Sequence, residues 1–499
     1  MRRNLTSKIT KSIIFLKNFS TYMSSRQYSF NQFDSLFSPQ HIAFIGASEK
    51  SALGSMLYLE AFKESKWVNN FYPVNPKYDK VLDWKCYSSV LEIPYPVDTA
   101  YISVKAKLVP SVLKECIQRN IPWVIVFSSG FSELGNKEGL LYENQIKQLL
   151  DSNSITRLIG PNCLGPFNSE YGMAFSFNVK KSLPGGVSFM SQSGGHLNQI
   201  LDIGRKRDIR YRYGVSFGNQ VDLNCVDFLY HYRKDKNTKI IAAYLESFGS
   251  GTGYEFFREL EKTTKEKPVI IWKGGYTEDG KKAAFSHTGA IASNLKLWYA
   301  MAKQTGAVMV KDNEEFWNTM KTFELLYPKH ILKGRNIGII TPGGGNAVNS
   351  TDLFSSYNLK IPELSSESQS KLAKILPEEN VNIQNPIDLG AFGFVIDIFI
   401  ECIEVLMAEV NLDIIVVPLW DHFLYKHIIN RIVTLIDQYN IPLALIMPSI
   451  ADSEEIAQRF SMVKKILHKK RVLYYLSTRD AARSISLYCD YAEFLNRNI

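Results

Sequence analysis

One histidine in the sequence stands where a transferred group could reach it. His287 lies in the stretch 280–291, where Ser, Thr, Gly and Ala residues surround it and two lysines precede it. An imidazole can carry a proton or a covalently transferred group near neutral pH. Because a lone histidine is more often structural than catalytic, His287 becomes a candidate only in company with residues that could serve it.

One carboxylate could act on such an imidazole. Glu246 directly follows the apolar run 240–245, which predicts a buried strand with an acid at its carboxyl end. A carboxylate there could orient an imidazole or stabilise its charged form. A solvated acid at a strand end explains the same pattern equally well.

A turn of small residues offers a place for an anion. Ser193, Gly194 and Gly195 join a predicted strand to a predicted helix. Small side chains leave the backbone N–H groups of a helix N-terminus open to an anionic ligand such as phosphate. A hydrolase elbow, G-x-S-x-G, would need a glycine two positions before Ser193, where the sequence has serine. We interpret the adjacent His196 as structural.

A phosphate-rich ligand is also indicated near the start of the chain. Gly46, Ala47 and Ser48 follow a predicted strand at 41–45, and Lys77 follows the next predicted strand. The turn lacks the G-x-G-x-x-G pattern, and a lysine stands where an NAD site needs a carboxylate. The lysine favours a phosphorylated ribose or a pyrophosphate, as in CoA or NADP. Simple turn geometry would explain the glycine alone.

Two Gly-Pro pairs enclose a polar pair further along the chain. Residues 158–166 have the sequence LIGPNCLGP, with Asn162 and Cys163 at the centre. Gly-Pro pairs favour a tight, non-helical loop. A domain linker is one interpretation, and we favour the other, a loop that lies against the ligand.

The elements that must position these residues alternate between strand and helix. Openings of the form strand, glycine turn and helix recur at Gly46, Gly194 and Gly343. This alternation predicts an α/β fold of parallel, doubly wound sheets with ligands at the carboxyl ends of the strands. A length of 499 residues suggests about three domains.

Composition argues against several classes of protein. The net charge is +9, but six basic residues and no acid fall in residues 1–33, so the remainder carries +3, which does not indicate nucleic-acid binding. No apolar run approaches the roughly 18–20 residues that a membrane span needs. The six cysteines are scattered without a C-x-x-C pair, which argues against a zinc site or a disulfide framework. We therefore expect no metal site, no membrane and no nucleic-acid partner.

The first residues have the composition of a targeting segment. Residues 1–33 are basic, rich in Ser and Thr, and include an apolar patch at 13–16. This composition is typical of an organelle transit peptide, here mitochondrial or of a related organelle. The alternative is a disordered tail, or an upstream start codon, on a cytoplasmic protein. In either case residues 1–34 are expected to lie outside the first domain.

The motifs and their order resemble a known family. The sequence is similar to the α subunit of the ADP-forming acyl-CoA synthetases (acetate–CoA ligases), in the succinyl-CoA synthetase superfamily. The similarity covers nearly everything after residue 35. Its motifs are FIGASEKSALG, PVNPK, FSSGFSELG, IGPNCLG, SQSGG, SFGNQVDLN, YLES, AAFSHTGAIA, TPGGGNAVNSTD, NPIDL and TRDAARSISLYCDY.

This resemblance implies a fold and roles for the residues above. It implies a Rossmann-like CoA-binding domain at 35–166, followed by two flavodoxin-like ligase domains at 167–330 and 331–499. His287 would be phosphorylated, with Glu246 as its hydrogen-bond partner. The remaining roles would be phosphate binding by Ser193, Gly194 and Gly195, CoA binding by Gly46, Ala47, Ser48 and Lys77, and contact with the thiol end of CoA by Asn162 and Cys163.

The resemblance also implies a reaction. Acyl-CoA, ADP (or GDP) and phosphate would give a small carboxylic acid, CoA and ATP (or GTP) through an acyl phosphate and phospho-His287. The nucleotide and Mg would bind a separate ATP-grasp β subunit, because the sequence lacks an ATP-grasp half, and the assembly would be a hetero-oligomer. At Val104-Lys105-Ala106 the family usually has a proline after the strand, so the pantetheine contact there stays open.

Two other functions fit parts of the pattern. A CoA-binding regulatory or scaffold protein without catalysis would explain the missing ATP-grasp half, but not the histidine and the glutamate. A protein lysine acetyltransferase on this scaffold would need an appended acetyltransferase domain. Residues 331–499 instead have the pattern of a further ligase domain.

Overall fold

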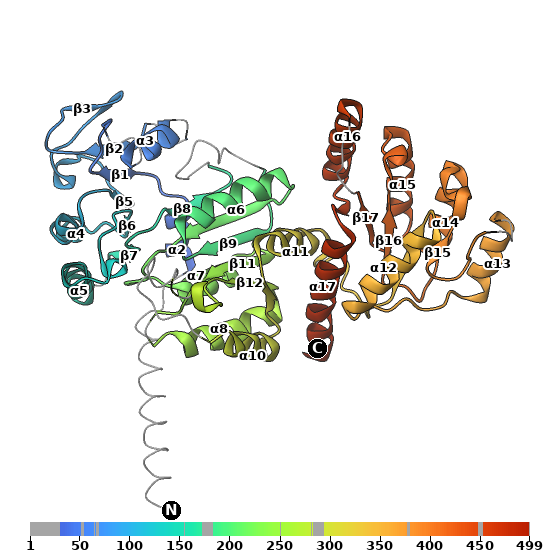
Figure 1. Cartoon of the computed structure of the whole chain (residues 1–499). Helices are drawn as coiled ribbons and strands as arrows, with labels where there is room; N and C mark the ends of the chain where they lie inside the picture. Colours follow the sequence, from blue (N-terminus) through green and yellow to red (C-terminus); the bar gives the residue numbers. More distant parts are fainter. Residues whose placement is uncertain are drawn as a thin grey trace, which may run out of the picture.

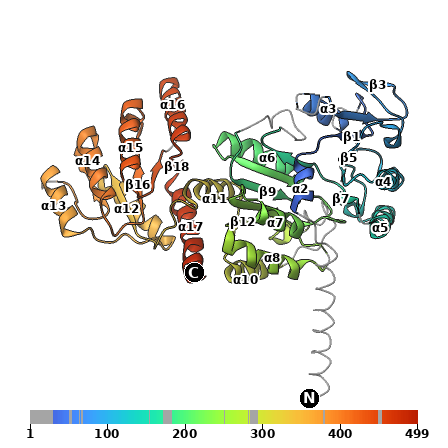
Figure 2. The ribbon, with the colours of Figure 1, turned by 180° about the vertical axis from the view of Figure 1, so that it is seen from behind.

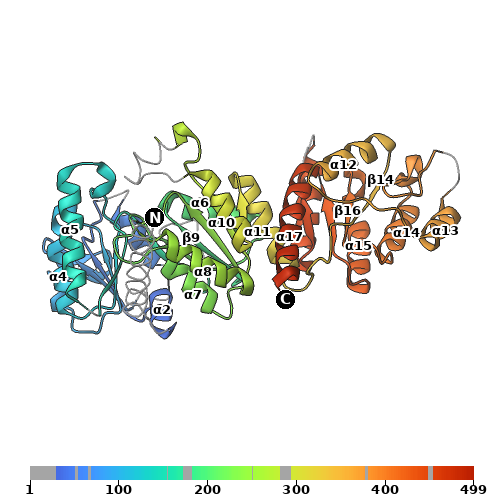
Figure 3. The same cartoon turned by 90° about the horizontal axis from the view of Figure 1, so that it is seen from below.

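Three largely parallel sheets lie in a row along the molecule, each flanked by helices (Figure 1, Figure 3). The computed structural model describes residues 30–50, 54–63, 65, 69–153, 155–171, 183–249, 251–280, 282, 294–376, 380–447 and 453–498. None of the helices in these ranges is long and apolar enough to cross a membrane.

The first sheet is parallel throughout, with the strand order β2-β1-β5-β6-β7. Alternate residues of β1 pack into different cores, Ile42 and Phe44 into one and Ala43 and Ile45 into the other. A strand buried on both faces needs a continuous apolar run, which the sequence supplies. The elements are β1 (Ile42–Ile45), α3 (Ser55–Lys63), β2 (Phe71–Val74), β3 (Lys80–Val81), β4 (Trp84–Lys85), η1 (Val90–Glu92), β5 (Thr99–Ile102), η2 (Ala106–Leu108), α4 (Val109–Gln118), β6 (Trp123–Val126), η3 (Ser132–Leu134), α5 (Lys137–Asp151) and β7 (Arg157–Ile159), where η marks a 3₁₀ helix.

The second sheet has the order β13-β12-β11-β9-β10-β8, and its edge strand β8 runs antiparallel to β10. Helices α6 and α11 cover one face of this sheet and α7 and α8 the other, so that β11 is again buried on both sides. The elements are β8 (Gly165–Asn168), β9 (Val187–Ser191), α6 (Gly194–Lys206), β10 (Tyr211–Ser216), α7 (Cys225–Lys234), β11 (Ile240–Leu245), α8 (Gly253–Glu266), β12 (Val269–Lys273), α10 (Leu295–Thr305), β13 (Val308–Val310) and α11 (Asn313–Leu326).

The third sheet is parallel, with the order β15-β14-β16-β17-β18. Its elements are β14 (Ile337–Thr341), α12 (Gly344–Ser356), α13 (Ser366–Ile375), β15 (Ile387–Asp388), η4 (Gly390–Phe394), α14 (Ile396–Met407), β16 (Ile414–Pro418), η5 (Asp421–Phe423), α15 (Lys426–Gln438), β17 (Leu443–Ile446), α16 (Glu454–Lys470), β18 (Leu473–Tyr475) and α17 (Thr478–Asn498).

The C-terminal helix joins the second and third units. α17 lies between their two sheets and packs along α11 (Figure 1, Figure 2). The hydroxyl of Tyr491 donates to the carbonyl oxygen of Thr264 at 3.0 Å, and Arg483 pairs with Glu315 at 2.7 Å. The third unit is therefore held against the second by both apolar and polar contacts.

A short helix before β1 belongs to the folded body. α2 (Phe30–Phe37) packs on α7 and β8, and its buried Phe33 and Phe37 stack on the ring of His231 with centroid distances of 4.9 and 5.3 Å. This helix starts within residues 1–34 and contacts the second unit. The boundaries at residues 34, 166 and 330 stay predictions, although β8 already carries Gly165 and Pro166 into the second sheet.

One strand order recurs in all three sheets. If the strands of each unit are numbered along the chain, without the β3–β4 hairpin and β8, the order is 2-1-3-4-5 every time. In such sheets ligands bind at the carboxyl ends of strands 1 and 3, where the connections diverge to opposite sides. The α/β fold expected from the sequence is confirmed, and the expected ligand edges are those of β1 and β5, of β9 and β11, and of β14 and β16.

Candidate functional site

A glutamine bridges the two strand ends at the ligand edge of the second sheet. β9 and β11 are parallel neighbours, so the residues that follow them share one edge. Oε1 of Gln192 accepts the backbone N–H of Glu246 at 2.8 Å and that of Ser247 at 3.0 Å, and Nε2 donates to Oγ of Ser247 at 3.1 Å. The turn that follows β9 is therefore tied to the segment that carries Glu246.

Glu246 is buried, not a solvated acid at a strand end. Its residue is 5% exposed, and the hydroxyl of Tyr244 donates to Oε1 at 3.2 Å. Burial, and then the nearby carboxylate, raise the pKa of Tyr244 above its ordinary value, so the phenol remains a donor. Nζ of Lys273, at the end of β12, donates to the carbonyl oxygen of Glu246 at 2.7 Å. The glutamate is held on its backbone and on its side chain.

The predicted phosphate turn opens helix α6. Ser193 is the N-cap residue, and its hydroxyl accepts the backbone N–H of His196 at 3.4 Å. The first N–H groups of an α-helix have no partner within the helix, and a Cβ on Gly195 would meet nothing within 4 Å. This end of α6 can accept an anion. The ring of His196 stacks on Tyr244 at a centroid distance of 4.2 Å, as suits a structural histidine.

A cavity of about 170 Å³ connects this turn to the first unit. Two of the predicted sets meet there, because Asn162 and Cys163 face the same space as Gly194 and Gly195. The other residues that line it are Phe127, Leu164, Gln192, Gly218 and Asn219. The loop expected to touch a thiol and the turn expected to touch phosphate therefore share one cavity.

The thiol of Cys163 shapes this cavity without being poised to react. Its Sγ donates to the carbonyl oxygens of Val126 and Ile159 at 3.5 and 3.4 Å, and burial raises its pKa to about 12. Asn162 adopts a φ of +59°, and its backbone N–H donates to the carbonyl oxygen of Ser128 at 3.0 Å. The loop itself is shorter than the expected 158–166, because β7 and β8 take both ends of that stretch.

The predicted CoA residues gather at the ligand edge of the first sheet. Gly46 has a φ of +89°, and a Cβ there would collide with the carbonyl oxygen of Ser103 at the end of β5. The N–H groups of Gly46 and Ala47 donate to the carbonyl oxygen of Val74 at 2.9 and 3.4 Å. Only glycine fits this close approach between the turn after β1 and the neighbouring strand ends.

A side chain from the second strand completes the turn. Nδ2 of Asn75 donates to the carbonyl oxygen of Ala47 at 2.8 Å, and its Oδ1 accepts the backbone N–H of Lys77 at 3.0 Å. The hydroxyl of Ser48 accepts the N–H of Lys50 at 3.2 Å. Lys77 is exposed, so its ammonium stands at the open side of this edge.

The central histidine of the prediction cannot be placed. His287 lies outside the described residues, as do its neighbours from 283 to 293. The following helix α10 begins at Leu295, with Asn294 as its N-cap.

The roles of two residues of the site were not predicted from the sequence. Gln192 is part of the SQSGG motif, yet its bond to Glu246 depends on β11 lying beside β9. Lys273 is the last residue of the strand sequence VIIWK. Because a lysine is rarely buried without a partner, its place at the end of a buried parallel strand could have indicated a role in the site.

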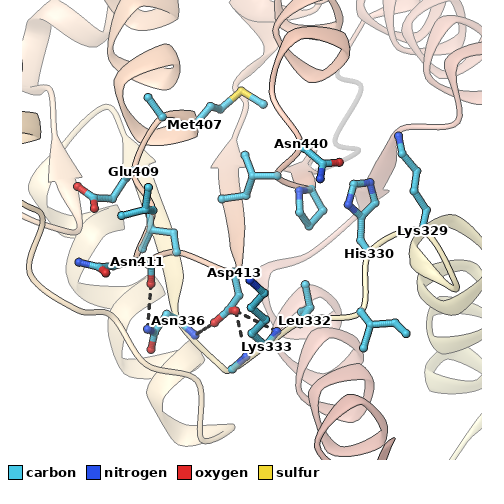
Figure 4. Close-up of a pocket in the computed structure, with 17 residues that line it drawn as sticks. Lys329, His330, Leu332, Lys333, Asn336, Met407, Glu409, Asn411, Asp413 and Asn440 are labelled. Carbon is cyan, nitrogen blue, oxygen red and sulfur yellow. Dashed lines mark hydrogen bonds between the residues drawn. The ribbon is translucent and has the colours of Figure 1, made fainter. Parts of the chain in front are cut away.

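A larger hollow, of about 720 Å³, lies away from the ligand edges (Figure 4). It is formed by loops that precede β14, β16 and β17, at the amino ends of these strands. There the carboxylate of Asp413 accepts the backbone N–H groups of Lys333, Gly334 and Asn336 at 3.2, 3.0 and 2.8 Å, which ties the loops together (Figure 4). None of the described residues predicted to act in the site lines this hollow.

Comparison with known proteins matches two regions of the chain to family models. Residues 40–168 match a CoA binding domain, and residues 184–323 match a succinyl-CoA ligase like flavodoxin domain. These regions contain the first and second sheets, with the two ligand edges described above.

Sequence comparisons over most of the chain give archaeal relatives. The chain is 36% identical to the acetate–CoA ligase [ADP-forming] of Methanocaldococcus jannaschii over 70% of this chain and 48% of that protein. It is 33% identical to subunit alpha of the acetate–CoA ligase [ADP-forming] II of Pyrococcus furiosus, over 77% of this chain and 81% of that one. The chain spans about half the length of the Methanocaldococcus and Archaeoglobus relatives.

A solved structure has the same architecture. A chain of the dinucleotide forming acetyl-coenzyme A synthetase 1 of Ca. Korarchaeum cryptofilum, in complex with phosphate and ADP, matches with a TM-score of 0.80 and 29% identity. The match covers 94% of this chain and 99% of that chain, so it includes all three sheets.

Proposed function

The chain belongs to the family of the ADP-forming acetate–CoA ligases, and we propose that it acts as the α subunit of a nucleoside-diphosphate-forming acid–CoA ligase. The observation that carries the proposal is the bridge from Gln192 to Glu246. It ties the segment that carries this buried glutamate to the turn that opens α6, and that turn shares a cavity with Asn162 of the CoA-binding domain. A phosphoryl carrier needs this combination of an anion site, a carboxylate and access to a thioester.

The proposed reaction has three steps. Phosphate attacks the thioester carbonyl of an acyl-CoA, the C–S bond breaks, and an acyl phosphate and CoA form. The imidazole of His287 then takes the phosphoryl group and releases the carboxylic acid. Phospho-His287 finally passes the phosphoryl group to ADP or GDP, which becomes ATP or GTP.

The residues of the site would bind phosphate, orient the imidazole and hold CoA. The N–H groups at the start of α6, around Gly194 and Gly195, would stabilise the phosphoryl oxygens. The carboxylate of Glu246 would hydrogen-bond the imidazole of His287 and favour its charged form. Gly46, Ala47, Ser48 and Lys77 would hold CoA at the edge of the first sheet, with the thiol end directed to the cavity at Asn162 and Cys163.

A separate subunit would supply the nucleotide. We assign ADP or GDP, together with Mg, to an ATP-grasp β subunit in a hetero-oligomer. The support is that relatives matching over most of both chains are named as α subunits. The Ca. Korarchaeum protein with the same architecture was solved in complex with phosphate and ADP.

Phosphate incorporation tests the proposal. The purified full chain is incubated with acetyl-CoA and radiolabelled inorganic phosphate, and protein-bound label is measured before and after acid treatment. Acid-labile label on the wild type and none on H287A is expected. An unlabelled wild type, or label that persists in H287A, overturns the proposal. CoA binding without label, even with a β subunit added, favours a non-catalytic CoA-binding protein instead.

A further inference from the structure

We propose that Lys273 and Gln192 are positioning residues that hold the peptide groups on both sides of Glu246, with the charge of Lys273 essential to this role. Gln192 binds the N–H of Glu246, and Lys273 binds its carbonyl oxygen. The two side chains come from β12 and from the turn after β9, on opposite sides of β11. The role of both residues rests on the proposed function.

The two contacts fix the backbone of Glu246 from both directions. Its N–H belongs to one peptide group and its carbonyl to the next, so φ and ψ are both constrained. Gln192 also accepts the N–H of Ser247, so the peptide group between Glu246 and Ser247 is held by two hydrogen bonds. Because the side chain of Glu246 starts from the Cα between these groups, the direction of its Cα–Cβ bond is set by Gln192 and Lys273 together.

The burial of Lys273 calls for an explanation in terms of charge. The residue is 2% exposed, and its Nζ donates to the carbonyl oxygens of Glu246 and Gly274. It also lies 5.6 Å from the centroid of the Trp298 ring. Burying an ammonium costs free energy even when it is hydrogen-bonded. A methionine would fill similar space without that cost, but it could donate to neither carbonyl oxygen.

The charge suits the chemistry proposed for this edge. Leu245 pairs directly with Lys273 in the parallel β11–β12 ladder, so the ammonium stands beside the strand end that presents Glu246. Phosphate, acyl phosphate and phosphohistidine would all add negative charge beside that carboxylate. A fixed positive charge, already desolvated, stabilises such anions without reorganisation during the reaction.

The residue that ends α8, ahead of β12, is a matched control. Lys267, just before β12, also donates from Nζ to two carbonyl oxygens, those of Tyr232 at 2.8 Å and Asp235 at 2.6 Å. It stands at the amino end of β12, the opposite edge from Glu246. Replacing Lys267 removes the same kind of hydrogen bonds without reaching the proposed site.

The test measures the labelling rate of the full chain with acetyl-CoA and radiolabelled phosphate. K273M is expected to slow labelling by roughly tenfold or more, in keeping with a lost charged hydrogen bond. CoA affinity, measured by calorimetry, should stay unchanged. K267M should label at the wild-type rate, and K273R, which keeps the charge, should recover part of the loss.

Four results are decisive. Labelling of K273M at the wild-type rate overturns the proposed role. An equally reduced labelling rate in K267M also overturns it, because the effect would then be general destabilisation. If K273M fails to fold, Q192M removes the other contact and must show the same slow labelling. An unlabelled wild type overturns the proposed function itself, which separates the two failures.

Discussion

Oε1 of Gln192 and the backbone nitrogen of Glu246 lie 2.8 Å apart, joined by a hydrogen bond across the gap between β9 and β11. One residue precedes the N-cap of α6, and the other follows β11. The bond ties the turn that opens α6 to the segment that carries Glu246. A change at Glu246 should therefore affect phosphoryl transfer without loosening the fold.

E246Q is expected to block phosphorylation while leaving the protein folded. Glutamine keeps the shape and can still accept the hydroxyl of Tyr244, which now lies 3.2 Å from Oε1, but it carries no charge. Loss of the charged partner of an imidazole should slow labelling by roughly a hundredfold or more. The measurement is acid-labile phosphate on the full chain, with E261Q on the exposed side of α8 as control. Normal labelling in E246Q would exclude a role for this carboxylate.

Much of the framework could be predicted because it depends on local sequence. β11 has the bounds of the predicted run 240–245, since buried parallel strands appear as continuous apolar runs. The turns at Gly46 and Ser193 were also placed. The roles of Gln192 and Lys273 could not be predicted, because each residue contacts Glu246 only as a result of the order of the strands in the sheet. Nothing local to LIGPNCLGP indicates that its end pairs antiparallel with β10.

G46A is expected to weaken both the first domain and its CoA binding. An alanine Cβ would collide with the carbonyl oxygen of Ser103, and the φ of +89° adds strain. G135A is the matched control, because Gly135 also has a positive φ, of +66°, but open space around it. Strain alone should cost about 1–2 kcal/mol, and G46A should cost clearly more. Thermal unfolding and calorimetric titration with CoA measure both effects, and equal stability of the two variants would contradict the close approach.

His231 should make stability depend on pH in a defined window. Burial lowers its pKa to about 3, against 6.5 for an unfolded histidine. Between these values the unfolded chain binds a proton that the native chain does not. The contribution of His231 to the free energy of unfolding is therefore fully present above pH 6.5 and is lost as the pH drops toward 3. The slope is at most about 1.4 kcal/mol per pH unit.

H231F tests this window, because phenylalanine keeps a ring between Phe33 and Phe37 but cannot titrate. Urea unfolding at several pH values should give a shallower loss of free energy below pH 6.5 in H231F than in the wild type. His468, whose burial lowers its pKa to about 4, contributes equally to both proteins and cancels in the difference. Identical slopes would mean that His231 does not titrate differently on folding.

We propose that the basic segment that precedes α2 targets the protein to an organelle. Residues 1–29 fused to a fluorescent protein should reach a mitochondrion or related organelle, and the chain without them should stay in the cytosol. That truncation keeps α2 and the stacking of its Phe33 and Phe37 on His231. Deleting residues 1–37 also removes Phe33 and Phe37, both buried against His231, and each such loss costs about 3–5 kcal/mol. The same cytosolic distribution with and without residues 1–29 would refute the targeting role, whatever the stability of the longer deletion.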